Sequence, residues 1–169
     1  MNEVPLFSSL NIKSITLRNR IVLSPMCQYK AKDGMISDWH LQHYSRFAFS
    51  GLGAAFIEAT GVSPEGRIGH GCTGIWSDDH IEGLSKIAKT FKEYNCVSGI
   101  QLAHAGRKAS FLRPWDGASP ITKDDKIEPA WQTIGPSAIP INENSPVPKE
   151  MSLLDINNVK QAFKVAAQR

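Results

Sequence analysis

The chain has 169 residues, of which 41% are hydrophobic and 21% charged, and its formal net charge at pH 7 is +3. These proportions are ordinary for a globular protein and exclude collagen-like and low-complexity classes. No apolar run reaches the roughly 18 residues that cross a bilayer, and the basic residues are scattered, so neither a membrane nor a nucleic-acid partner is expected.

Short apolar segments in the first two thirds of the chain predict strands. Alternating residues at 10–13 and 16–19 predict a small N-terminal β-hairpin. Continuous apolar runs follow at 21–23, 54–57 and 97–103. Runs of this length are typical of strands that are buried on both faces of a parallel sheet.

Apolar residues recur with a helical period between these strands and again at the end of the chain. The first predicted helix covers residues 38–50 and stops at Gly51. The second follows Ser77 as its N-cap and ends at Asn95, and the third begins at Ser152. Strands that alternate with helices define an α/β protein with right-handed crossovers.

A segment rich in Pro, Gly and Trp, residues 104–151, separates the third strand from the last helix. Loops of this length are uncommon in compact domains and are often functional. We expect part of it to form a second hairpin. The last helix is still in full pattern at Arg169, which suggests that the chain is one portion of a longer fold.

The cysteines indicate a reducing compartment. Cys27, Cys72 and Cys96 are odd in number, far apart in sequence, and form no Cys-x-x-Cys pair. This pattern argues against a disulfide framework or a structural zinc site. Because residues 1–10 also lack the pattern of a secretory signal, we expect a cytoplasmic protein.

Side chains that could bind a ligand or take part in catalysis occur at the end of each predicted strand. The first leads into Ser24-Pro25-Met26-Cys27-Gln28-Tyr29 at its carboxyl end, the edge at which α/β barrels build active sites. From residue type alone, Cys27 is equally a small buried hydrophobe. Small residues at 58–61 permit close approach to a flat ligand or form a tight turn. Gln101 offers the donor and acceptor that a heteroaromatic edge requires.

Histidines supply the other candidate site. His40 and His43 are neighbours on one helical face, and His104 follows the third strand. A packing and helix-start role is favoured for the first two because no Glu or Cys accompanies them. His104 and Arg107 suit either an anion or carboxylate partners. No nucleotide-binding glycine loop and no Gly-x-Ser-x-Gly nucleophile turn occurs.

Taken in chain order, these segments resemble the Old Yellow Enzyme family of FMN-dependent ene-reductases, and within it the cysteine-containing branch of the xenobiotic reductases. The resemblance extends over essentially the whole chain. The matching segments are 17–22, 24–29, 40–44, 58–62, 74–78, 101–108, 113–115, 136–138 and 148–151.

The resemblance implies a (β/α)8 TIM barrel. Residues 1–169 would supply the N-terminal part of that single domain, with a short hairpin and about three β/α units. It further implies that Ser24, Pro25, Met26 and Cys27 lie against FMN, largely through backbone groups. Cys27 stands where another branch of the family has Thr, and its thiol is expected to tune the redox potential.

The same resemblance assigns the remaining site residues. Tyr29 is expected to face the substrate, which makes Cys27 and Tyr29 the catalytic candidates. Ala59 offers a backbone contact to the flavin ring, and Gln101 hydrogen-bonds the pyrimidine edge. Arg107 ranks lower because it would serve equally to hold the barrel mouth together.

The implied reaction passes hydride from NADPH or NADH through FMN to an activated alkene or a nitro compound, with the flavin supplying the difficult step. The family's substrate-activating His pair and its phosphate-binding loops belong to later strands. The intact protein is expected to form a homo-oligomer. Two alternatives stay open: a catalytically silent partial barrel that needs the C-terminal half, and a metal-dependent barrel hydrolase that uses His40, His43 and His104.

Overall fold

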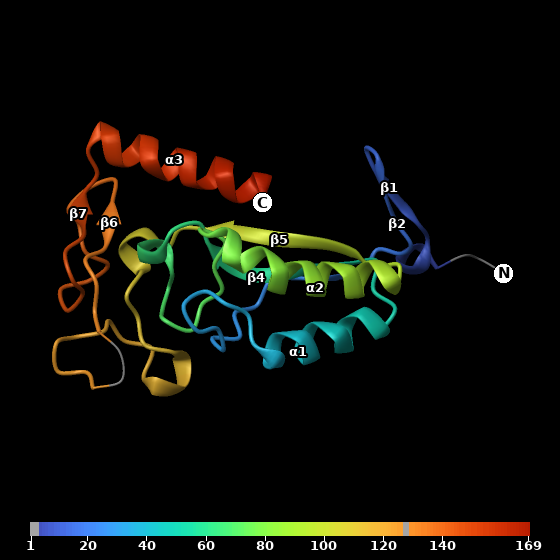
Figure 1. The fold of residues 1–169 in the computed structure, drawn as a ribbon, viewed down its shortest axis with the longest axis horizontal. Coiled ribbons are helices and arrows are strands. Elements are labelled where there is room, and N and C mark those ends of the chain that lie inside the picture. Colours follow the sequence, from blue (N-terminus) through green and yellow to red (C-terminus); the bar gives the residue numbers. More distant parts are fainter. Residues whose placement is uncertain (1–3, 127–128) are drawn as a thin grey trace.

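The computed structural model describes residues 4–126 and 129–169, and it opens with the predicted hairpin (Figure 1). Strands β1 (Leu10–Ile12) and β2 (Ile15–Leu17) pair antiparallel, with Leu10 opposite Leu17. Lys13 takes a positive φ of 51° in the connecting turn. The hairpin stands at one end of the molecule, near the N-terminus (Figure 1).

The central sheet has the three parallel strands that the sequence predicts. Strands β3 (Val22–Leu23), β4 (Ala54–Gly61) and β5 (Val97–Ala103) lie in the order β3-β4-β5. Strand β4 runs beyond the predicted 54–57, because Glu58 and Thr60 are fully buried there with hydrogen-bond partners. Polar residues at a strand end therefore do not mark its boundary here.

Strand β4 contains a β-bulge. Ile57 is paired with Ile100 and Ala59 with Gln101, so Glu58 is an extra residue without a partner on β5. Such a residue breaks the alternation of side chains across the sheet. Ile57 and Glu58 are both buried on the side of the helices, at 4% and 0% exposure.

Three helices cover one face of the sheet. Helix α1 (Asp38–Phe49) and helix α2 (Ile81–Glu93) lie in contact with each other, and α3 (Leu153–Gln168) packs against β5 (Figure 1). Their ends match the predicted ones within one or two residues, although a 3-10 turn, Asp78–His80, precedes α2. The core side chains include Tyr44, Ile57, Ile87, Phe91 and Ala166.

The opposite face of the sheet is open to solvent. Phe56 is 39% exposed, and Ser98 and Gln101 are also exposed. The prediction that these strands are buried on both faces is therefore wrong for this chain. The physical reason is that the described helices form a layer on one face only.

Among the described residues of the long loop, the predicted second hairpin is reduced to one isolated antiparallel bridge, Phe111 with Pro120, and is not formed by the named strands. Strands β6 (Ile134–Gly135) and β7 (Lys149–Glu150) pair parallel, not antiparallel. The segment between them contains prolines at 136, 140, 146 and 148, which lack the N–H that a tight antiparallel ladder requires. No helix within the described residues is long and apolar enough to cross a membrane.

Candidate functional site

The candidate site lies at the carboxyl ends of the three parallel strands. Strand β3 leads into the turn formed by residues 24–29, and the bulge in β4 brings Ala59 opposite Gln101 of β5. Two residues predicted independently from different segments are thus direct neighbours across a strand pair. Adjacent parallel strands present their carboxyl ends at the same edge, where α/β barrels bind ligands.

Cys27 is the most densely connected of the predicted site residues. Its thiol is half-buried and lies near the Cys72 thiol, the backbone of Ala59 and the Tyr29 side chain. The Cys72 thiol is the main cause that lowers the pKa of Cys27, while burial and the nearby Glu58 charge oppose it. The structure therefore brings Cys27, Tyr29 and Ala59 close together.

Tyr29 adopts a backbone conformation that is rare for a bulky residue. Its φ is 52°, and its ring packs edge-on against Trp115 with centroids 6.0 Å apart. Burial is the main cause that raises the pKa of Tyr29 to about 12, followed by Cys27. The phenol is consequently a protonated hydrogen-bond donor at neutral pH. Positive φ at such a residue is a feature of functional sites.

Cys72 enters the site from a glycine-rich segment that follows β4. Its side chain is 1% exposed, and its pKa is raised, first by the neighbouring Cys27 thiol and then by burial. The Gly71 carbonyl accepts the Ala31 N–H at 2.9 Å, and a Cβ at Gly71 would meet the carbonyl of Tyr29. Sequence spacing did not predict this contact, although the glycines were a sign of close backbone packing.

Gln101 presents an amide that is free to bind a ligand. The side chain is exposed, and none of the described residues hydrogen-bonds it. A donor and an acceptor therefore lie beside Ala59. Together with the Cys27 sulfur and the Tyr29 hydroxyl, this set fits the polar edge of a flat heteroaromatic ring.

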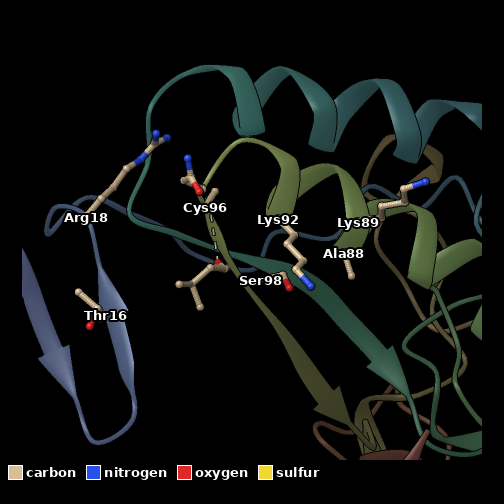
Figure 2. Close-up of a pocket in the computed structure, with 9 residues that line it drawn as sticks. Thr16, Arg18, Ala88, Lys89, Lys92, Cys96 and Ser98 are labelled. Carbon is tan, nitrogen blue, oxygen red and sulfur yellow. Dashed lines mark hydrogen bonds between the residues drawn. The ribbon is translucent and has the colours of Figure 1, made fainter.

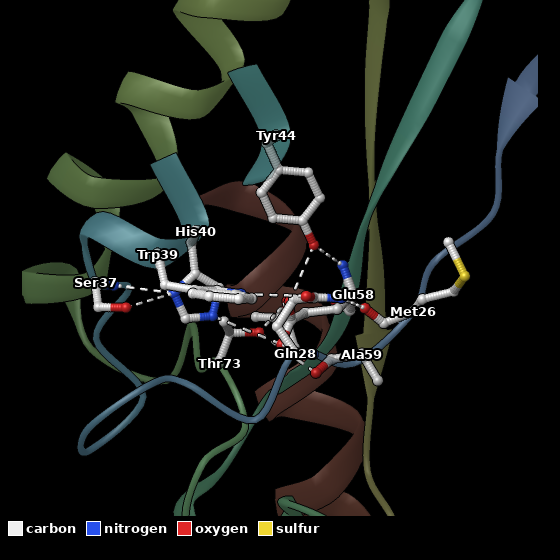
Figure 3. Close-up of polar contacts among 10 residues, drawn as sticks. Met26, Gln28, Ser37, Trp39, His40, Tyr44, Glu58, Ala59 and Thr73 are labelled. Carbon is white, nitrogen blue, oxygen red and sulfur yellow. Dashed lines mark hydrogen bonds and ion pairs between the residues drawn. The ribbon is translucent and has the colours of Figure 1, made fainter. Parts of the chain in front are cut away.

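A buried carboxylate lies directly behind the turn (Figure 3). Glu58 is fully buried; its Oε1 accepts the Gln28 N–H at 3.0 Å, and its Oε2 accepts the Tyr44 O–H at 3.1 Å. The Tyr44 oxygen in turn accepts the Glu58 N–H at 2.8 Å. His40 Nε2 lies 3.7 Å from Oε1. Sequence reasoning named Glu58 only as part of a strand end.

The three histidines serve separate structural roles. His40 Nδ1 accepts the Ser37 N–H at 3.0 Å at the start of α1, which confirms its helix-start role. His43 packs edge-on against Tyr44, with centroids 5.0 Å apart. His104 lies 3.9 Å from Glu65. Within residues 4–126 and 129–169, no group of three or more His, Cys, Asp or Glu side chains is arranged to hold a metal ion.

Arg107 connects the mouth of the site to the long loop. Its Nη1 donates to the carbonyls of Ile139 and Pro140, at 3.3 and 3.4 Å. These contacts favour the role of holding the mouth together over that of a ligand contact.

A separate hollow of about 730 Å³ lies at the amino end of β5 (Figure 2). It is lined by Arg18, Lys89, Lys92 and Ser98 among others, and Lys92 extends toward Ser98 (Figure 2). Active sites of α/β barrels form at the other end of the strands. None of the predicted site residues lines this hollow.

Comparisons with known proteins show the family of the chain. A family model described as the NADH:flavin oxidoreductase / NADH oxidase family matches residues 5–169. The NADPH dehydrogenase of Geobacillus thermodenitrificans is 46% identical over 171 residues, which cover 100% of this chain and 45% of that protein. The chain therefore spans about half the length of the relatives that it matches.

Solved structures show the same fold. Morphinone reductase matches with a TM-score of 0.79 and 22% identity, covering 96% of this chain and 44% of that one. Old Yellow Enzyme from Pichia sp. AKU4542 matches with a TM-score of 0.78 and 23% identity, over 97% and 42% of the two chains. These likenesses confirm the predicted α/β barrel fold class.

The family description names a flavin, and the Geobacillus relative is named for NADPH, which are the two cofactors expected from the sequence. The match covers nearly every described residue, from the hairpin to α3. The chain belongs to the NADH:flavin oxidoreductase / NADH oxidase family.

Proposed function

We propose that this protein is an FMN-dependent NAD(P)H oxidoreductase that reduces activated carbon–carbon double bonds, such as those of enones and nitroalkenes. One observation carries the proposal: Cys27, Tyr29, Ala59 and Gln101 come from three strand ends and meet at one edge of the sheet. When bound, FMN supplies the hydride chemistry. The residues of this chain hold and orient the ring.

Each residue has a role that its surroundings support. Backbone groups of Ser24, Pro25 and Met26 would line one side of the ring, and Met26 is 48% exposed on that turn. Gln101 would bind the pyrimidine edge, since its amide is exposed and unpaired among the described residues. Ala59 is small enough to let the backbone approach the ring.

Cys27 and Tyr29 would act at the reacting side. The surroundings of the Cys27 sulfur favour its anionic form, so it is suited to tune a flavin potential. Tyr29 stays protonated at neutral pH, and its single O–H would turn from Cys27 to donate to a bound substrate. A donor placed where negative charge develops lowers the barrier of such a reduction.

The test is a titration of the purified protein with FMN, followed by an assay with NADPH and cyclohexenone. We expect FMN to bind with a change in its visible spectrum and, without oxygen, NADPH to be oxidised beyond one equivalent of FMN only when the enone is present. Protein that stays colourless with added FMN and leaves NADPH unchanged would contradict the proposal.

A catalytically silent partial barrel is the second candidate. The open face of the sheet, with Phe56 and Gln101 exposed, favours it. In this case FMN would bind weakly or not at all until a complementary C-terminal half is added. The partial-barrel domain, the homo-oligomer and the cytoplasmic location stay predictions, the last supported by three free thiols.

A further inference from the structure

Glu58 is a fully buried carboxylate that the binding of a flavin ring does not itself require. It is the extra residue of the β4 bulge, and its side chain points toward α1 instead of the open face of the sheet. Burying a carboxylate is unfavourable unless its oxygens are well satisfied. An apolar residue would pack there more easily, so the hydrogen-bond partners of Glu58 indicate why a carboxylate stands at this position.

Every described group that reaches the carboxylate is a donor. The Gln28 N–H and the Tyr44 O–H bond its two oxygens, at 3.0 and 3.1 Å. The Ser37 N–H donates to His40 Nδ1, so the imidazole proton sits on Nε2, which faces Oε1 at 3.7 Å. Both oxygens of the Glu58 carboxylate thus act as hydrogen-bond acceptors.

The bond to Gln28 acts on the backbone of the candidate site. Gln28 lies between Cys27 and Tyr29, where the chain leaves the strand and passes through the positive φ of Tyr29. A side-chain bond at this amide fixes the direction of the chain on both sides. Because Tyr44 holds the other carboxylate oxygen, the turn is connected to the rigid helix α1 (Figure 3).

We propose that Glu58 is the positioning residue of the candidate flavin site: it holds the turn at 24–29 through the Gln28 amide and places a negative charge behind Cys27. The role of the turn rests on the proposed function, but the two contacts of Glu58 do not. Cys27 is faced by Cys72, Tyr29, the Ala59 backbone and this carboxylate.

Two substitutions of Glu58 distinguish the effect of its side-chain length from the effect of its charge. Glu58→Asp keeps the charge but is one methylene shorter, so we expect the Gln28 amide to exchange with solvent deuterium about tenfold faster or more. Glu58→Gln keeps one acceptor oxygen for the Gln28 N–H but removes the charge. Because the carboxylate opposes ionisation of Cys27, we expect Cys27 to react with iodoacetamide about three- to tenfold faster at pH 7, with its pH profile moved to lower pH.

Glu65→Gln is the matched control. Glu65 lies 3.9 Å from His104, an arrangement like that of Glu58 and His40, but it contacts neither Cys27 nor the turn. Glu65→Gln should change neither the exchange rate of the Gln28 amide nor the alkylation profile of Cys27. Mass spectrometry of the Cys27 peptide separates its alkylation from that of the buried Cys72 and Cys96.

The inference is overturned if Glu58→Asp leaves the Gln28 exchange rate unchanged, or if Glu58→Gln leaves the Cys27 profile unchanged. If either Glu58 variant fails to fold, Tyr44→Phe removes one donor to the same carboxylate and should raise Gln28 exchange by a smaller factor; no change would overturn the inference. FMN titration of the unaltered protein is scored separately, so failure to bind FMN counts against the proposed function and not against Glu58.

Discussion

The Cys27 thiol lies next to the thiol of Cys72, which belongs to a separate segment after β4, and each thiol shifts the pKa of the other. The two thiols are unequal: Cys27 is half-buried with a lowered pKa, and Cys72 is 1% exposed with a raised pKa. A thiol that donates to its neighbour stabilises the neighbour's thiolate. The pair therefore concentrates thiolate character on the accessible member.

Replacement of Cys72 should make Cys27 less reactive. Cys72→Ala removes the thiol that does most to lower the pKa of Cys27, so this pKa should rise. Alkylation of Cys27 by iodoacetamide at pH 7 is expected to slow several-fold. Cys72→Ser retains a donor and should keep most of the reactivity, while Cys96→Ala should have no effect. Faster alkylation in Cys72→Ala would contradict the assignment.

Gln101→Ala should weaken flavin binding without weakening the fold. Its side chain is exposed and has no hydrogen-bond partner in the described part of the chain, so the melting temperature should not change. Loss of two hydrogen bonds at about 1 kcal/mol each predicts a Kd for FMN that rises about 10- to 30-fold. A fluorescence titration measures it. An unchanged Kd would remove Gln101 from the binding set.

Gly71→Ala should destabilise the turn formed by residues 24–29, because residue 71 packs against the backbone of that turn. A Cβ at this position meets the backbone carbonyl of Tyr29, which cannot move independently of the turn. We expect a loss of about 1–3 kcal/mol in the free energy of unfolding, measured by urea denaturation. Gly135→Ala is the control, because its nearest neighbours lie at 3.4–3.5 Å and its φ is not positive. Equal effects of both substitutions would argue against a specific clash.

The Glu65–His104 contact predicts a small stability change in acid. The imidazole of His104, whose Nε2 lies 3.9 Å from the Glu65 carboxylate, is the main cause that lowers the pKa of Glu65 from 4.5 to about 2. Its stabilisation is present above about pH 4.5 and is lost as the pH falls toward 2. Because Glu65 is 40% exposed, the contribution is limited to about 1 kcal/mol or less.

A double-mutant cycle of Glu65→Gln and His104→Ala, unfolded in urea at pH 3 and pH 6, measures this contact. The coupling free energy should be present at pH 6 and smaller at pH 3. A coupling that is larger at pH 3 would have the wrong sign for a carboxylate with a lowered pKa.

Local patterns were sufficient to predict most elements of the fold. The hairpin, the three parallel strands and the three helices carry their own periodicity and caps, such as Ser152 with Asp155. The parallel pairing of β6 and β7 carries no such pattern, because both strands are two residues long and their partners are set by the packing of the whole loop. Whether the second face of the sheet is covered also depends on elements outside the sheet, which the residue pattern of the strands does not reveal.

Candidate site residues could be proposed from the sequence where a single segment contains both a strand and the side chains at its end. Cys27 and Tyr29 follow β3, Ala59 and Gln101 lie near the carboxyl ends of β4 and β5, and these strand ends converge by topology. Contacts between distant segments were not predictable: nothing in the spacing of Cys27 and Cys72 indicates that their thiols meet. Both Glu58 and Tyr44 were visible as residues, but their bond depends on a bulge that the alternation of side chains does not reveal.

The bulge in β4 has a practical consequence for anyone who transfers this site to another barrel. One unpaired residue lets two consecutive positions perform opposite tasks: Glu58 faces the helices, while Ala59 lies opposite Gln101. In a regular strand of the same sequence, Glu58 would take the place opposite Gln101 and each later side chain would change face. A graft that copies the residues but omits the irregularity would therefore bring a carboxylate to the ligand edge.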